Sequence, residues 1–182
     1  MVVIPQEFAR FLMPSLLSTH PEPAVRQILQ LDDREAKALA NARINFDRVL
    51  QQTIDARLKV IDVKDGIITA SLPAFPEERQ QLIAAWRAES LAALDADSAA
   101  MAAHIDFGRA MDGFFQGRVD LAVTFKPSPD APTHLIEYRG QTTSGDRRQN
   151  YRLQTGVPNS QLLKKFPSLQ PHFPQRSTET KP

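Results

Sequence analysis

The side chains best suited to binding chemistry lie in the last third of the chain. Four arginines and two tyrosines fall on two segments that we expect to form neighbouring strands: Tyr138, Arg139, Arg147, Arg148, Tyr151 and Arg152. Guanidinium groups pair with phosphate or carboxylate, and aromatic rings on a sheet can stack nucleic-acid bases. Arginines on a strand also protect an exposed edge from aggregation. The pattern therefore indicates a site for a polyanion, a site for an acidic protein surface, or a solvated strand.

Patterns typical of catalysis or of metal binding are missing from the sequence. None of the four histidines, His20, His104, His134 and His172, has another within ten residues, whereas metal sites usually combine histidines at helical spacing or with cysteines. No Gly-x-Ser-x-Gly or Ser-x-x-Lys motif occurs, and no glycine-rich segment carries the Lys and Ser/Thr of a phosphate-binding loop. We therefore expect no cofactor and no metal, and the sequence favours a non-enzymatic protein.

Two long helical segments precede the expected strands. Apolar residues recur at helical spacing over 33–58, and Asp32 followed by Glu35 matches a capping box at the start of that helix. A second helical stretch over 76–112 begins at a proline and has a junction near 95–98, where Asp97 is expected to cap the second part. Both segments have one apolar side, which predicts that each packs on a core.

The remaining elements read as strands. Residues 59–72 hold two β-branched runs around Asp65-Gly66, a pair typical of a tight hairpin turn. A three-stranded meander is expected over 119–154, with a polar turn region at 140–146. A short helix should follow over 160–166, capped by Asn159 or Ser160. The fold class is therefore α+β, with long amphipathic helices packed on an antiparallel sheet formed by the hairpin and the meander.

The ends of the chain differ in composition from its middle. Apolar residues at helical spacing predict an N-terminal contact helix within an arm over residues 1–24: Phe8, Phe11, Leu12 and Leu16. Residues 25–166 are expected to form a single α+β domain. Proline and polar residues dominate 167–182, which predicts a disordered or extended tail.

Charge is distributed unevenly along the chain. Residues 1–117 carry 12 Lys/Arg and 16 Asp/Glu, whereas residues 118–182 carry 10 Lys/Arg and 5 Asp/Glu. The chain has no cysteine, so disulfides and thiolate chemistry are excluded. No apolar run approaches the roughly 18–20 residues of a membrane span. We expect a soluble chain, cytoplasmic by default and extracytoplasmic if a leader precedes Met1.

The start of the first long helix resembles a known family. The segment QLDDRE, from Gln30 to Glu35, is similar to the Leu-Thr-x-x-Gln helix starts of small periplasmic stress chaperones. Asp32 and Glu35 stand in place of the Thr and Gln. The resemblance implies an all-helical periplasmic binding protein, and that fold has no place for the hairpin or the later strands.

Four classes of function follow from these observations. We predict a protein-interaction or scaffold protein that binds another protein or a second copy of itself. The first alternative is polyanion or nucleic-acid binding through residues 139–152, and the second is a stress-chaperone-like binding protein. An enzyme with a dispersed site forms the remaining class, which sequence patterns do not address.

Overall fold

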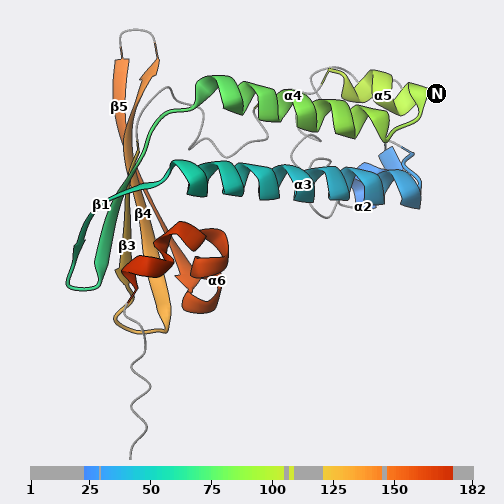
Figure 1. Cartoon of the computed structure of the whole chain (residues 1–182). Helices are drawn as coiled ribbons and strands as arrows, with labels where there is room; N and C mark the ends of the chain where they lie inside the picture. Colours follow the sequence, from blue (N-terminus) through green and yellow to red (C-terminus); the bar gives the residue numbers. More distant parts are fainter. Residues whose placement is uncertain (1–22, 29, 105–106, 109–120, 145–146, 174–182) are drawn as a thin grey trace, which may run out of the picture. The chain divides into compact units, whose positions relative to one another are not determined.

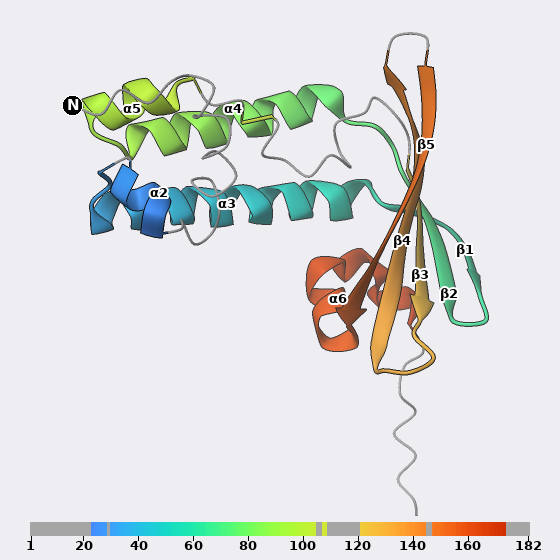
Figure 2. The ribbon, with the colours of Figure 1, turned by 180° about the vertical axis from the view of Figure 1, so that it is seen from behind.

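The computed structural model describes residues 23–28, 30–104, 107–108, 121–144 and 147–173. Their contacts form two compact units, one within residues 1–50 and 76–116 and the other within residues 51–75 and 117–182 (Figures 1 and 2). The expected N-terminal contact helix lies outside the described residues. The single α+β domain expected over residues 25–166 stays a prediction.

The first unit is helical. It contains α2 (Pro23–Ile28), the part of α3 (Asp33–Arg57) up to Leu50, α4 (Pro76–Ala92) and α5 (Ala96–Ala102). Phe46 of α3 stacks on Trp86 of α4 with ring centroids 4.5 Å apart, and Phe107 meets the same indole edge-on at 4.9 Å. Leu31, Leu39, Ala42 and Ala102 are buried in the same core. The two long helices are confirmed, and their apolar sides face each other across this core. The stretch expected to run to 112 is shorter, because α5 ends at Ala102 and the described residues 103–104 and 107–108 form turns.

Polar contacts bind the start of α3 to the junction between α4 and α5. The capping box is confirmed, because Asp32 accepts a bond from the Glu35 N–H at 2.7 Å and Glu35 accepts one from the Asp32 N–H at 3.0 Å. The second Glu35 oxygen accepts from the Asp95 N–H at 2.9 Å. The sequence prediction of an Asp97 cap was wrong, since Asp95 caps α5 by accepting from the Ser98 N–H at 2.7 Å. Helix α5 starts at Ala96, two residues earlier than an Asp97 cap would require.

The second unit is built on a five-stranded antiparallel sheet in the order β1-β2-β3-β4-β5. The expected hairpin consists of β1 (Lys59–Lys64) and β2 (Ile67–Leu72). Asp65 and Gly66 take φ values of 51° and 72° between the paired residues Lys64 and Ile67. Two left-handed residues in succession make a tight turn that matches the twist of the strands, so this prediction is confirmed.

The expected meander extends the same sheet. It consists of β3 (Leu121–Pro127), β4 (Thr133–Ser144) and β5 (Arg147–Pro158). The α+β class is therefore confirmed, and the sheet has no counterpart in the all-helical fold that the chaperone resemblance implies. Strand β4 is longer than expected because residues 140–144, predicted as part of a turn, continue the ladder in unbroken register. Strand β5 is longer because residues 155–158, beyond the predicted end at Gln154, pair with residues 133–136. Residues 141–144 are all polar in the sequence, which favoured a turn over a strand in sequence reasoning.

One face of the sheet is covered by α6 (Asn159–Lys165) and η2 (Pro167–His172), as Figures 1 and 2 show. Phe166 packs edge-on against Phe125 at 5.1 Å, and Leu162 and Leu169 are fully buried. The sequence placed residues 167–172 in the disordered or extended tail, but they form η2. The side chain of Leu169 is buried, and this burial stabilises η2.

The start of α6 also departs from expectation. Pro158 occupies the N-cap without a side-chain capping bond, so the predicted cap by Asn159 or Ser160 was wrong. Asn159 Oδ1 instead lies 2.6 Å from Nδ1 of the buried His134 on β4. This contact fastens α6 to the covered face of the sheet.

Candidate anion-binding sheet face

The two faces of the sheet differ in chemistry because side chains alternate along each strand. On β4, His134 and Ile136 are buried on the covered face, while Glu137 and Arg139 point to the other side. The register pairs Arg139 with Arg152, and Glu137 with Gln154. We call the face that carries Lys126, Glu137, Arg139, Arg152 and Gln154 the open face.

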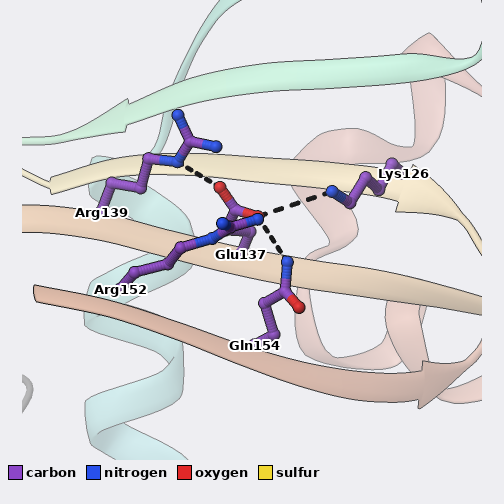
Figure 3. Close-up of polar contacts among 5 residues, drawn as sticks. All are labelled: Lys126, Glu137, Arg139, Arg152 and Gln154. Atoms are coloured by element: carbon purple, nitrogen blue, oxygen red, sulfur yellow. Dashed lines mark hydrogen bonds and ion pairs between the residues drawn. The ribbon is translucent and has the colours of Figure 1, made fainter.

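Glu137 is the centre of a polar cluster on the open face (Figure 3). Its Oε2 accepts from Arg152 and from Gln154 at 2.6 Å each, and Lys126 Nζ lies 3.5 Å from the same oxygen. Its Oε1 accepts from Nε of Arg139. Three strands, β3, β4 and β5, therefore contribute to the Glu137 cluster, which consists of Lys126, Glu137, Arg139, Arg152 and Gln154.

Burial within the Glu137 cluster is asymmetric. The Glu137 side chain is 2% exposed, whereas those of Arg139 and Arg152 are 61% and 57% exposed. The carboxylate is thus enclosed by its own partners, while the guanidinium groups remain in contact with solvent. Three cations surround one anion, so the cluster presents a net charge of about +2 to the outside.

The environment keeps Glu137 ionised. Burial alone would raise the pKa of this carboxyl, but hydrogen bonds from Arg152, Gln154 and Arg139, together with the charge of Arg139, lower the pKa to about 2. The carboxylate consequently holds both guanidinium groups in place. Each guanidinium offers five N–H donors. The hydrogen bonds to Glu137 engage one nitrogen of each, so each keeps donors for a ligand.

The structure unites part of the site expected from sequence. Arg139 and Arg152 lie side by side in adjacent strands, as predicted for a basic surface. Tyr138 follows the opposite alternation and pairs with Leu153, so it does not join the arginines. The backbones of Arg147, Arg148 and Tyr151 belong to β5, and their side chains lie outside the described part of the structure.

Sequence reasoning missed Glu137, Gln154 and Lys126. A signal for Glu137 was present, since an acidic residue two positions before Arg139 must share its side of a strand. Arg152 and Gln154 have the same spacing on β5. Only the register between β4 and β5 brings the two pairs together, and register was not among the predicted features.

The described open face carries no aromatic side chain. The residues whose alternation places them beside the Glu137 cluster are aliphatic, small or polar: Thr69, Ser71, Ala122, Thr124, Leu135 and Gly156. Within the described ranges, no group of three or more His, Cys, Asp or Glu side chains is arranged to hold a metal ion. None of the described helices is long and apolar enough to cross a membrane.

In comparisons with known proteins, no family model, curated protein or solved structure matches this chain.

Proposed function

We propose that this chain is a non-enzymatic binding protein and that its open sheet face binds an acidic surface of a partner protein. The observation that carries the proposal is the pair of Arg139 and Arg152, which are more than half exposed while their shared carboxylate is buried. If the two arginines served only to neutralise the Glu137 carboxylate, no third cation would be needed beside it. Lys126, 3.5 Å from Glu137, leaves the cluster with surplus positive charge.

Preorganisation supports binding by this face. Glu137 fixes one nitrogen of each guanidinium, so less side-chain entropy is lost when a carboxylate binds the remaining donors. Ala122 of β3, which is paired with Arg139 of β4, is small and exposed. The arginines are therefore accessible to a ligand carboxylate.

The chemistry of the open face favours an acidic protein over a nucleic acid. Sheet surfaces that bind single-stranded nucleic acid stack bases on aromatic rings. Tyr138 is on the opposite alternation from the arginines, and the described open face has no aromatic side chain. Carboxylates, in contrast, need only the guanidinium donors that the face provides.

A binding measurement with poly-glutamate and with a single-stranded poly-uridine RNA tests the proposal. We expect poly-glutamate to bind at low salt, and Arg152→Gln to weaken it by about threefold to tenfold, as loss of one charged hydrogen-bonding group predicts. Lys164→Gln is the matched control, because it removes one exposed positive charge from α6 rather than from the open face.

Two outcomes would oppose the proposal. Equal weakening by Arg152→Gln and Lys164→Gln would mean that only net charge matters. Tighter, Arg152-dependent binding of poly-uridine would instead support the nucleic-acid alternative.

A further inference from the structure

The long edge strand β5 lies directly beside the Glu137 cluster. In the order β1-β2-β3-β4-β5, one side of β5 pairs with β4 and the other ends the described sheet. The β4–β5 ladder runs without a register shift from Thr133–Pro158 to Ser144–Arg147. Asn150 and residues 152–156 are exposed. A regular edge of this length is a template for an additional strand.

The hydrogen-bonding groups of this edge can be assigned from the register. Ser144 pairs with Arg147 across two intervening residues, and residues that flank a two-residue hairpin loop exchange backbone hydrogen bonds. Because backbone groups alternate in direction, the N–H groups of Arg152, Gln154 and Gly156 point away from β4. Pro158, which has no N–H to donate, falls in the same alternating set.

We infer that the β5 edge binds an extended segment of a partner protein as a sixth strand, with acidic and apolar residues alternating along that segment. Acidic residues of such a strand would lie beside Arg152 on the open face. Its apolar residues would lie beside Leu153, which is 41% exposed and belongs to the opposite alternation. The inference rests on the proposed function and specifies how the acidic partner binds.

Charge argues against a second copy of this chain as the added strand. Residues 147–158 contain three arginines and no acidic residue. A two-fold antiparallel pairing centred on Asn150 would set Arg148 opposite Arg152, and directly opposed like charges are destabilising. A strand with acidic residues would instead place negative charge beside these arginines. Charge complementarity therefore favours a segment of a different protein as the added strand.

The test uses a labelled peptide in which Glu and Val alternate, compared with a peptide of the same composition in separate Glu and Val blocks. Binding is measured by fluorescence anisotropy with Gly156→Pro and Gly156→Ala. Proline removes the outward N–H, whereas alanine keeps it, and an added Cβ at 156 meets nothing within 4 Å. We expect Gly156→Pro to weaken the alternating peptide by about threefold to tenfold and Gly156→Ala to change affinity by less than about twofold.

Amide hydrogen exchange of the unaltered protein provides a second readout that does not depend on the proline variant folding. Bound alternating peptide should slow exchange at the outward N–H groups of Arg152, Gln154 and Gly156. Unchanged exchange there would overturn strand addition. So would equal affinity for the two peptides.

Failure of the inference is separable from failure of the proposed function. If Arg152→Gln still weakens poly-glutamate while the edge amides stay unprotected, the open face binds acids without adding a strand. If the chain alone self-associates and Gly156→Pro abolishes that association, a second copy occupies the edge and the inference is wrong.

Discussion

Glu137 links the stability of the sheet to pH. Its pKa is about 2 in the folded chain and 4.5 in the reference state, so the folded state favours the ionised carboxyl. The resulting stabilisation is fully present above pH 4.5 and is lost as the pH falls towards 2. In denaturant unfolding measured over this range, we expect the advantage of the unaltered chain over Glu137→Gln to shrink as the pH decreases.

The comparison with Glu137→Gln has an internal control. Lys126→Gln removes a cation from the same cluster but leaves the bonds from Arg152, Gln154 and Arg139, so it should retain most of the pH dependence. At neutral pH, Glu137→Gln should cost about 1–3 kcal/mol, because a buried acceptor is lost while the exposed arginines regain water. A pH dependence that is the same in both variants would contradict this account.

Glu35 has a comparable structural role in the helical unit. It is buried, and its two oxygens accept from the backbone N–H groups of Asp32 and Asp95. Glu35→Ala should therefore lower the free energy of unfolding by about 1–3 kcal/mol. Glu89→Ala is the control, since Glu89 makes an exposed bond to Asn45 and should change stability by less than about 0.5 kcal/mol. Equal effects in urea titrations would show that the Glu35 bonds contribute little.

At the scale of elements, the β1–β2 turn requires glycine for its backbone conformation. Gly66 has a φ of 72°, and a Cβ there would meet Pro127 only at an ordinary distance of 3.6 Å. Strain rather than collision should therefore make Gly66→Ala destabilising by about 1 kcal/mol. Gly156→Ala has no left-handed φ to strain and serves as the control in thermal unfolding. A neutral Gly66→Ala would contradict the tight-turn assignment.

The elements also show which features sequence patterns predict. Asp65-Gly66 and the Asp32/Glu35 capping box act through neighbouring backbone groups, so local sequence identified both. Helix caps were less predictable where several candidate residues lie close together. Asp95, not the expected Asp97, caps α5. The Glu137 cluster depends on the register between strands, which local periodicity does not encode. Only its two arginines were therefore predicted as site residues.

At the scale of the whole molecule, the chain passes repeatedly between its two compact units. Helix α3 is continuous from Asp33 to Arg57, although its residues up to Leu50 belong to the helical unit and those from Gln51 belong to the sheet unit. The hairpin 59–72 is then inserted between α3 and α4. Whether the two units unfold together, as the single domain expected from the sequence would, is a prediction that mutation and unfolding can test.

Trp86 allows that expectation to be tested, because it is the only tryptophan and is buried in the helical unit. Leu169→Ala opens a cavity in the sheet unit, where Leu169 is fully buried, and such truncations cost about 2–5 kcal/mol. If the chain unfolds as one domain, this change should lower the denaturant midpoint of Trp86 fluorescence as much as that of far-UV circular dichroism. Leu39→Ala provides the matched truncation within the helical core. An unmoved Trp86 transition in Leu169→Ala, alongside a shifted one in Leu39→Ala, would mean that the two units unfold independently.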